Sequence, residues 1–475
     1  MQNPLSKLLI ANLFVFLFVS CQSDKGYKTD WNLPAFLLKQ GELSQLEFWA
    51  DSVKGQSTQF DVQWMKADSF AQIAKRIAID FSVDKDVVKE QLIERVGDFT
   101  EEEWRDWNAS GLLEGRMLNG EKKYFKRAVS NLAILTGKGD GLLDEALDAF
   151  CLEHSVEVIK ETKQVKNSRV AKRSFVIEYS LAVDANAIPA GEVLRCWLPY
   201  PKAHHARQGS VKFLGSFPEE YRVSEDSCVH RSIYLEQVAV SNQKTEFKLT
   251  FSFDTQAEYV DLSQEHVLPY DQESVVYKEY TKQRLPHIAF TKEIMQLTDS
   301  ICGEDVEPVE LVKKIYYWID KTIPWAGALE YGIMPNIPEY VLSYKKGDCG
   351  MQTLLFMSMA RYKGIPVRWQ SGWMLHPGEV NLHDWCEVYY QGVGWVPLDM
   401  SFSLQKSNDE QLRNFYISGI DAYRLIVNDG IGAEFCPSKQ YLRSEPWDFQ
   451  RGEVEWKGGN LYFDQWDYHM SVSYK

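Results

Sequence analysis

The stretch from Gly347 to Ser401 limits the possible folds of this chain more than any other part of the sequence. Apolar residues recur at helical spacing through Met351–Ala360, directly after Gly347-Asp348-Cys349-Gly350. We therefore expect a helix whose first turn carries the cysteine. Lys363-Gly364-Ile365-Pro366 should end that helix, because glycine suits the C-cap and proline cannot continue the helix. A thiol at a helix N-terminus lies beside unpaired N–H groups and the positive end of the helix dipole, which favour the thiolate.

Three strands are expected after this helix. Val367–Trp373 is rich in β-branched and aromatic residues, His383–Tyr390 is the next strand, and Trp395–Asp399 follows a glycine-rich turn. The last two strands form a hairpin with the imidazole of His383 at its start and the carboxylate of Asp399 at its end. A thiol, a base and a group that orients the base together make a nucleophilic site.

The length of the hairpin loop decides whether this imidazole and this carboxylate can meet. A two-residue loop places Asp399 on the opposite face of the sheet from His383. A three-residue loop pairs Asp399 with Trp385 and makes it a same-face diagonal neighbour of His383. We therefore predict the longer loop, or a compensating bulge.

Three motifs in this region resemble the transglutaminase-like core of the papain-fold superfamily. They are the cysteine at a helix start, His-x-Trp-x-Glu-Val in a strand, and Gly-Trp-Val-Pro-Leu-Asp closing the next strand, all within Glu307–Ser401. The resemblance implies a papain-like core with Cys349 as nucleophile, His383 as general base and acid, and Asp399 as the group that holds the imidazole. It also implies an upstream aromatic residue near the oxyanion site, for which Trp325 is the candidate.

Acyl transfer is the chemistry that this resemblance implies. The Cys349 thiolate would attack an amide carbonyl, His383 would protonate the leaving amine, and a thioester would form. The backbone N–H of Cys349 would donate one hydrogen bond to the oxyanion. Water resolving the thioester gives a peptidase or amidase acting on peptide or protein substrates, which we favour for an exported bacterial protein without an evident calcium motif. A lysine amine gives a protein-crosslinking transglutaminase.

A catalytically silent role is the competing interpretation. Cysteine is among the most buried residue types, so Cys349 could be an ordinary core residue. Folds also persist after their chemistry is lost. The chain would then be a binding module of the cell envelope, although the order of the cysteine, histidine and aspartate motifs favours catalysis.

The N-terminal residues Met1–Cys21 are expected to be a signal peptide. They carry one basic side chain, Lys7, and then the apolar run Leu8–Val19, which is too short for a membrane span. The run ends in Ser20-Cys21 and resembles a bacterial lipoprotein signal. This resemblance implies export, lipidation of Cys21, and a lipid anchor in a bacterial membrane, facing the periplasm or the surface. An ordinary secreted protein with cleavage nearby is the alternative.

Composition excludes several function classes. A net charge of −15 without long basic runs argues against nucleic-acid binding. The eight cysteines are irregularly spaced and form no zinc or disulfide motif. We therefore predict no metal and no cofactor, and the sequence does not indicate an oligomeric state. The spacing does not pair the six cysteines other than Cys21 and Cys349, namely Cys151, Cys196, Cys228, Cys302, Cys386 and Cys436.

The length of 475 residues predicts several domains. A helical N-terminal domain is expected at 30–168, with an apolar stripe from Phe70 to Phe81 behind Ser69 as a cap. Thr100-Glu101-Glu102-Glu103 reads as a capping box, and Asn119-Gly120 as a turn.

The period of the apolar residues changes to two after this region, which predicts an antiparallel β-sandwich at 173–261. The five expected strands are Ser174–Val183, Val193–Pro199, Val211–Ser216, His230–Gln237 and Thr245–Phe253. A transglutaminase-like catalytic domain with a C-terminal β extension should fill 262–475, and Pro308 should open one of its helices. The predicted fold class is therefore a multidomain α+β chain.

Overall fold

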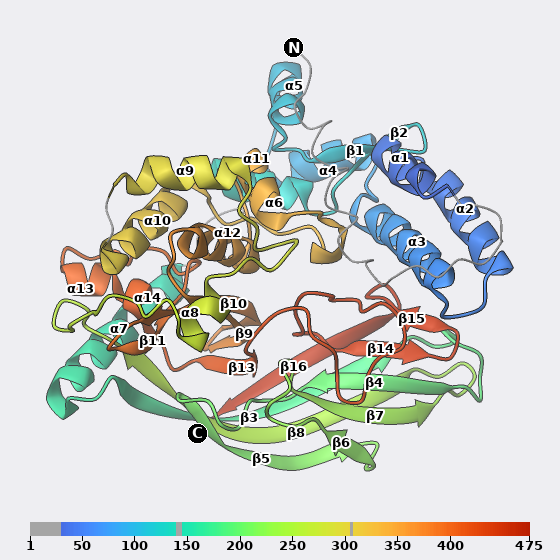
Figure 1. Cartoon of the computed structure of the whole chain (residues 1–475). Coiled ribbons are helices and arrows are strands. Elements are labelled where there is room, and N and C mark those ends of the chain that lie inside the picture. Colours follow the sequence, from blue (N-terminus) through green and yellow to red (C-terminus); the bar gives the residue numbers. More distant parts are fainter. Residues whose placement is uncertain (1–29, 139–144, 305–306) are drawn as a thin grey trace. The chain divides into compact units, whose positions relative to one another are not determined.

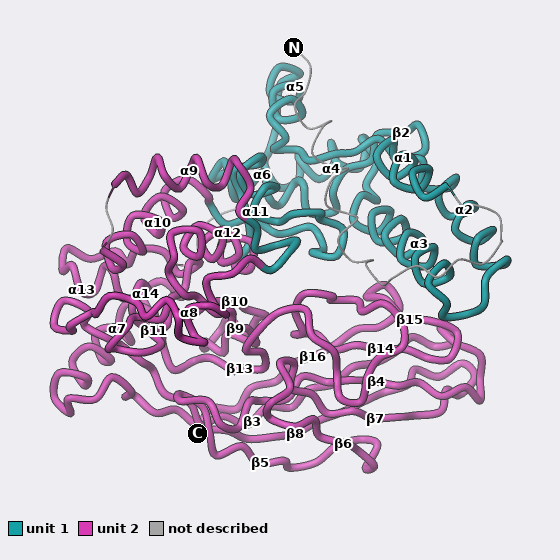
Figure 2. Tube along the Cα trace, viewed as in Figure 1, with its two compact units in different colours: residues 1–143, 284–289, 324–348 teal, residues 144–283, 290–323, 349–475 magenta. Residues whose placement is uncertain are grey.

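The computed structural model describes residues 30–138, 145–304 and 307–475. The chain divides into two compact units, each built from several segments (Figure 2). Unit 1 comprises residues 1–143, 284–289 and 324–348, and unit 2 comprises residues 144–283, 290–323 and 349–475. The expected signal peptide and its lipidation residue, Cys21, lie outside the described residues.

Unit 1 is mainly helical (Figure 1). Its described elements are α1 (Asn32–Gln40), α2 (Leu43–Gln56), α3 (Val62–Asp80), α4 (Lys85–Arg95), α5 (Glu101–Ser110), β1 (Gly115–Leu118), β2 (Glu121–Tyr124), α6 (Ala128–Thr136), η2 (Tyr331–Ile333) and α11 (Ile337–Tyr344). The capping box before α5 is confirmed, since Thr100 and Glu103 bond each other's backbone N–H. The Asn119-Gly120 turn is also confirmed, because Leu118 pairs with Glu121 and both turn residues have positive φ.

The predicted cap at Ser69 is wrong. Helix α3 begins at Val62, where the carboxylate of Asp61 accepts a hydrogen bond from the Trp64 N–H. Ser69 lies inside the helix and its hydroxyl donates to the carbonyl of Met65 at 2.9 Å. A serine hydroxyl that bonds the preceding turn is compatible with a helix interior, so the apolar stripe alone could not locate the start.

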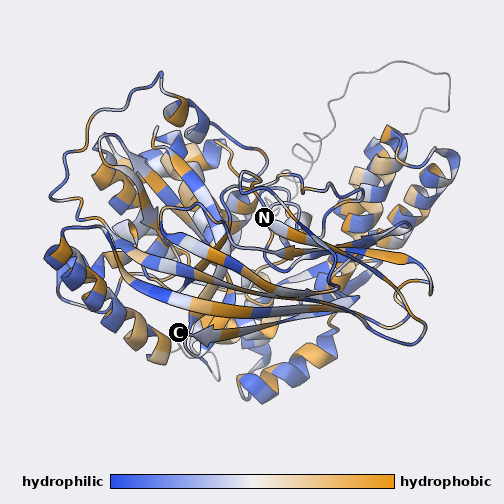
Figure 3. Cartoon of the chain, turned by 90° about the horizontal axis from the view of Figure 1, so that it is seen from below, coloured by the Kyte–Doolittle hydropathy of each residue, from blue (hydrophilic) through white to orange (hydrophobic). Residues whose placement is uncertain are grey.

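Unit 2 contains two five-stranded antiparallel sheets. One has the order β12-β8-β3-β16, with β5 also pairing with β8, and the other has the order β15-β14-β4-β7-β6. Their strands are β3 (Arg169–Val183), β4 (Val193–Pro199), β5 (Gln208–Phe217), β6 (Tyr221–Val223), β7 (Ser232–Val238), β8 (Thr245–Tyr259), β12 (Gly419–Ile420), β14 (Glu453–Trp456), β15 (Gly459–Leu461) and β16 (Trp466–Tyr474). Hydrophobic and hydrophilic residues alternate along these strands (Figure 3).

The two sheets share one core because side chains at alternate positions point inward. The core includes Phe175 and Ile177 of β3, Trp197 of β4 and Phe251 of β8, all at most 1% exposed. The predicted strands between residues 174 and 253 are therefore confirmed as elements. The chain returns to these sheets after residue 452, because β14 pairs with β4 and β16 pairs with β3.

A smaller four-stranded sheet of unit 2 has the order β11-β10-β9-β13. Its strands are β9 (Val367–His376), β10 (Glu379–Tyr390), β11 (Gly394–Leu398) and β13 (Arg424–Asn428). Trp373 and Leu375 of β9 and Leu425 and Val427 of β13 join the sandwich core. One face of this sheet is thereby fixed to the sandwich.

The helices of unit 2 are α7 (Glu145–Val165), α8 (Val275–Tyr280), α9 (Lys292–Cys302), α10 (Pro308–Thr322), α12 (Cys349–Tyr362), α13 (Glu410–Arg413) and α14 (Phe415–Ser418). Helix α12 contacts β10, α9 and α10, and its residues from Gly350 to Arg361 are all buried. Pro308 opens α10, as predicted, and the helix turns Val312, Ile315 and Tyr316 inward.

The fold class expected from the sequence is confirmed: helices dominate the N-terminal region, and the sheets of unit 2 are antiparallel. None of the helices in the described part of the chain is long and apolar enough to cross a membrane.

Candidate active site

Cys349 is the first residue of α12, as predicted from the sequence. The helix ends at Tyr362, and Gly364 follows with a φ of +75°. The N–H of Ile365 then donates to the carbonyl of Ala360 at 3.0 Å, which closes the last turn. The sulfur-bearing residue is partly exposed, although the helix behind it is buried. A buried helix therefore holds an accessible thiol at its N-terminus.

The loop of the β10–β11 hairpin has the predicted three residues, because Tyr390 pairs with Gly394. Cys386 pairs with Leu398, so Asp399 lies one position beyond the end of β11 and on the face that carries His383. The Nε2 atom of His383 lies 2.7 Å from Oδ2 of Asp399. Both side chains are buried. The contact expected from the loop length is therefore present.

The second oxygen of Asp399 and its carbonyl group are also bonded. Oδ1 accepts a hydrogen bond from the Ser401 N–H at 3.0 Å, and the hydroxyl of Tyr316 donates to the Asp399 carbonyl at 2.9 Å. Tyr316 comes from the buried face of α10. The helix therefore fixes the backbone that presents the carboxylate.

Arg424, the first residue of β13, is a site residue that sequence reasoning missed. Its Nη1 atom lies 2.9 Å from Oδ2 of Asp399, and its Nη2 atom lies 2.6 Å from Oδ2 of Asp421. The guanidinium is completely buried, with its carbon atom 4.3 Å from the ring centre of Phe402. The sequence did contain a signal for this residue, because Arg424 begins the apolar strand Arg424–Asn428 and follows Asp421 by three positions.

These charges decide the protonation of the histidine–aspartate pair. Burial by itself raises the pKa of Asp399. The charges of His383 and Arg424 lower it by more, so the net pKa is below the ordinary value. Burial lowers the pKa of His383 despite the raising effect of Asp399. An ionised Asp399 can only accept, so a neutral His383 carries its proton on Nε2. The lone pair of the imidazole is then on Nδ1.

Asp384 is a second site residue that the sequence motifs did not identify. The Cys349 thiol donates to Oδ2 of Asp384 at 3.4 Å. Asp384 follows His383 in β10, so the two side chains leave opposite faces of the strand. The Gln450 amide donates to Oδ1 of Asp384 and to the carbonyl of His383, both at 2.9 Å. The one acidic residue directly beside the histidine was the signal in the sequence.

A second buried carboxyl group, that of Asp448, lies behind Asp384. The two are hydrogen-bonded to each other, and burial raises the pKa of Asp448. Oδ1 of Asp448 accepts from the Ser371 hydroxyl at 2.5 Å and from the Asn428 amide at 3.1 Å. A hydrogen bond between two carboxyl groups needs one proton, so at least one member of the pair is protonated. The cysteine therefore contacts one member of an acid pair, Asp384.

Trp325 was the sequence candidate for the oxyanion site. Trp325 belongs to unit 1, where it forms a bridge with Gly347 and is 42% exposed. Its role at the oxyanion stays a prediction, as does the role of the Cys349 N–H. No group of three or more His, Cys, Asp or Glu side chains among the described residues is arranged to hold a metal ion.

Comparison with known proteins identifies one region. Residues 295–400 match the transglutaminase-like superfamily. An uncharacterized protein of Haemophilus influenzae is 25% identical over 232 residues, which are 43% of this chain and 62% of that relative. The chain thus spans about three fifths of the length of the curated relative it matches.

Two solved structures are similar to parts of this chain. A protein from Cytophaga hutchinsonii that is described as a candidate cysteine protease is 14% identical, covers 65% of this chain and 91% of its own, and has a TM-score of 0.44. The periplasmic domain of TgpA from Pseudomonas aeruginosa is 11% identical, with coverages of 53% and 90% and a TM-score of 0.25.

The family match covers the helix that starts at Cys349 and the hairpin that carries His383 and Asp399. Residues 295–400 of this α+β chain therefore form a transglutaminase-like domain.

Proposed function

We propose that the protein is a thiol-dependent acyltransferase that hydrolyses peptide or protein amide bonds. Cys349, His383 and Asp399 would form its catalytic triad. The observation that carries the proposal is the buried contact of 2.7 Å between His383 and Asp399, made in a domain whose cysteine starts a buried helix. A neutral imidazole backed by an ionised carboxylate is a suitable base for a thiol.

The reaction requires the Cys349 thiol, which bonds Asp384 in the structure, to come within hydrogen-bond reach of Nδ1 of His383. Nδ1 takes the thiol proton, and the sulfur attacks the amide carbonyl carbon. The imidazolium then protonates the leaving nitrogen, the carbon–nitrogen bond breaks, and a thioester remains on Cys349. Asp399 stays ionised throughout and stabilises the imidazolium through Nε2. A water molecule, deprotonated by Nδ1, cleaves the thioester and restores the thiol.

Arg424 has a positioning role in this proposal. Its charge lowers the pKa of Asp399 and so keeps the acceptor of the imidazole ionised. It makes the histidine itself harder to protonate, because a cation near an imidazole disfavours the imidazolium. The base therefore stays available at mildly acidic pH.

A catalytically silent binding module is the second candidate, and one contact favours it. The sulfur of Cys349 donates to a carboxylate, Asp384, and a carboxylate beside a thiol disfavours the thiolate. A crosslinking transglutaminase differs from the proposed hydrolase only in the acceptor of the acyl group. We also propose that the protein is exported and held in the cell envelope by a lipid on Cys21.

The test is a digest of a peptide library by the full chain, read by mass spectrometry. We expect new amine termini with the wild type and none with Cys349→Ala or His383→Ala. A second arm adds a small primary amine. Incorporation of that amine in preference to water would assign the crosslinking reaction. Equal products from wild type and Cys349→Ala would overturn the enzymatic proposal.

A further inference from the structure

Two cysteines from distant parts of the chain meet on unit 2. Cys228 lies in the connection between β6 and β7, and Cys436 lies in the long connection between β13 and β14. Their sulfur atoms are 3.2 Å apart, although 208 positions separate them in the sequence. A disulfide bond is about 2.05 Å long, so closing the bond requires a sulfur movement of about 1 Å.

The backbone is held in place at both cysteines. The ammonium group of Lys202 donates to the carbonyl of Cys228 at 2.6 Å. On the other side, the Trp197 indole donates to the carbonyl of Pro437 at 2.8 Å, and Phe435 is 1% exposed in the sandwich core. The sulfur atoms can therefore approach by side-chain rotation while these contacts keep the two segments together.

Exposure separates this pair from most of the other cysteines. Cys436 is exposed and Cys228 is partly exposed. Apart from Cys349, the other cysteines of the described residues, namely Cys151, Cys196, Cys302 and Cys386, are buried. An oxidant in solution consequently reaches Cys228 and Cys436 as neighbours, and exposure is one condition for thiol exchange.

We propose that Cys228 and Cys436 are a disulfide site, closed by an oxidant of the disulfide class. One thiolate attacks the oxidant and forms a mixed disulfide, which releases the first thiol of the oxidant. The other cysteine then attacks the protein sulfur of that mixed disulfide, and the second thiol leaves. The two cysteines lose two electrons and two protons, and the oxidant gains them. Such bonds persist in oxidising compartments.

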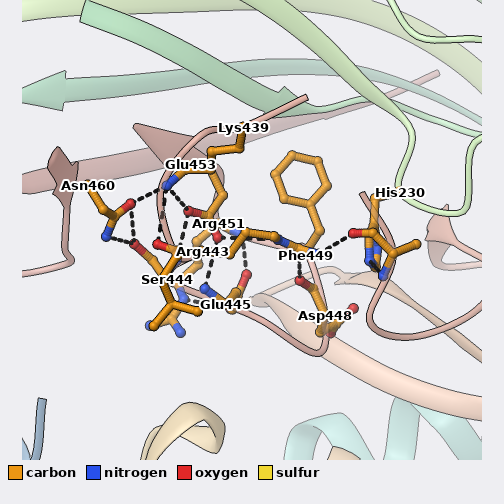
Figure 4. A network of polar contacts seen from close by, with 12 residues as sticks. His230, Lys439, Arg443, Ser444, Glu445, Asp448, Phe449, Arg451, Glu453 and Asn460 are labelled. Carbon is orange, nitrogen blue, oxygen red and sulfur yellow. Dashed lines mark hydrogen bonds and ion pairs between the residues drawn. The ribbon is translucent and has the colours of Figure 1, made fainter. Parts of the chain in front are cut away.

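The bond would pin the connection between β13 and β14, residues 429–452. A polar network organises this segment (Figure 4). The carboxylate of Glu453 accepts from the N–H groups of Ser444 and Glu445, both at 2.8 Å. The same segment carries Asp448 and Gln450, whose side chains bond Asp384 of β10. The disulfide would therefore hold the element that supports the strand of the candidate site.

The experiment incubates the reduced full chain with oxidised glutathione and maps its peptides without reduction. We expect a crosslinked peptide joining Cys228 to Cys436, with the loss of two hydrogen atoms. In Cys436→Ser we expect glutathione on Cys228 and no crosslink. Separate glutathione adducts on both cysteines of the wild type, or two thiols that stay open to alkylation, would overturn the proposal.

The pinning is measured by hydrogen exchange on the same preparation. Oxidised protein should exchange the amides of 429–452 more slowly than protein kept reduced, and Cys436→Ser should exchange them at the reduced rate in both conditions. Because one chain is compared in two redox states, a folding defect of a variant does not affect the comparison. Equal exchange in both states would contradict the pinning. The same comparison on Cys349→Ala, which removes any effect of glutathione bound to Cys349, should give the same slowing of exchange.

Discussion

The residues around the His383 imidazole illustrate how buried charges control one another. Asp399 and Asp421 lie on either side of Arg424, and all three are at most 1% exposed. A buried cation between two carboxylates compensates charges that would otherwise be costly to bury. The sequence motif included only one member of this group, because the other two come from a later strand and the turn before it.

Replacing Arg424 with Met removes the buried cation and leaves the carboxylates of Asp399 and Asp421 without their ion-pair partner. Breaking a buried ion pair costs about 3–5 kcal/mol, and the pKa of Asp399 should rise because one of its lowering charges is lost. We expect the variant to unfold at a lower urea concentration than the wild type, because its free energy of unfolding is smaller. Arg222→Met on exposed β6 is the control. A stability equal to that of the control would contradict the role given to Arg424.

Replacing Asp384 with Asn removes the carboxyl group 3.4 Å from the Cys349 sulfur, and with it any negative charge at that position. A unit charge at this range is worth at least about 1 kcal/mol, so the thiolate should form more readily. We expect alkylation of Cys349 by iodoacetamide to be about fivefold faster or more at mildly acidic pH. Asp467→Asn, an exposed change on β16, should leave the rate unchanged. A rate for Asp384→Asn that matches this control would show that Asp384 does not govern the sulfur.

At the scale of the elements, local patterns predicted the β10–β11 hairpin well. The glycine C-cap of α12 and the three-residue loop of β10–β11 follow from local backbone preferences. The position of Asp448 could not be predicted in this way, because it reaches Asp384 from a segment 64 residues later in the chain with no regular period. Tertiary packing decides such contacts, and a single sequence does not encode them as a local pattern.

The start of α11 provides a second element-scale case, in unit 1. The Ile337 N–H donates to Nδ1 of His287 at 3.2 Å, and the Asn336 amide donates to the Pro286 carbonyl at 2.8 Å. His287 is completely buried, and burial lowers its pKa to about 3. The segment 284–289 therefore supports the helix only while this imidazole is neutral.

This pKa makes a prediction about acid stability. The unfolded chain binds the proton near pH 6.5, whereas the folded chain resists it until about pH 3, so stability is complete above 6.5 and falls as the pH drops. We expect a loss of about 2 kcal/mol between pH 7 and pH 5 from this residue. His287→Asn keeps an acceptor for the Ile337 N–H and should lose that part of the pH dependence in urea titrations. An unchanged dependence would contradict this assignment.

At the scale of the whole molecule, the sequence order and the order in space diverge. The expected sandwich strands were found between residues 169 and 259, but both five-stranded sheets are completed by strands from after residue 452. Segments 284–289 and 324–348 likewise join unit 1 although their neighbours in the sequence belong to unit 2. Returning segments of this kind have no signal in composition or period, so contiguous ranges could not describe the units.

A truncation tests how far unit 2 depends on its returning strands. A chain that ends after Arg451 lacks β14, β15 and β16 and leaves the edges of β3 and β4 unpaired. Unpaired edges promote association, so we expect loss of cooperative unfolding and of soluble protein. Removing only residues 473–475 should have little effect on thermal unfolding. A truncated chain that unfolds like the full chain would contradict the dependence.

The central claim is that His383 and Asp399 make Cys349 a nucleophile, and the alkylation rate of Cys349 tests it most directly. Reduced protein is treated with iodoacetamide at mildly acidic pH, and N-acetylcysteine in the same solution is the reference for an ordinary exposed thiol. The account predicts that Cys349 is modified faster than this reference and that His383→Ala slows its modification to the rate of the reference or below. A Cys349 that reacts no faster than N-acetylcysteine in the wild type would contradict it.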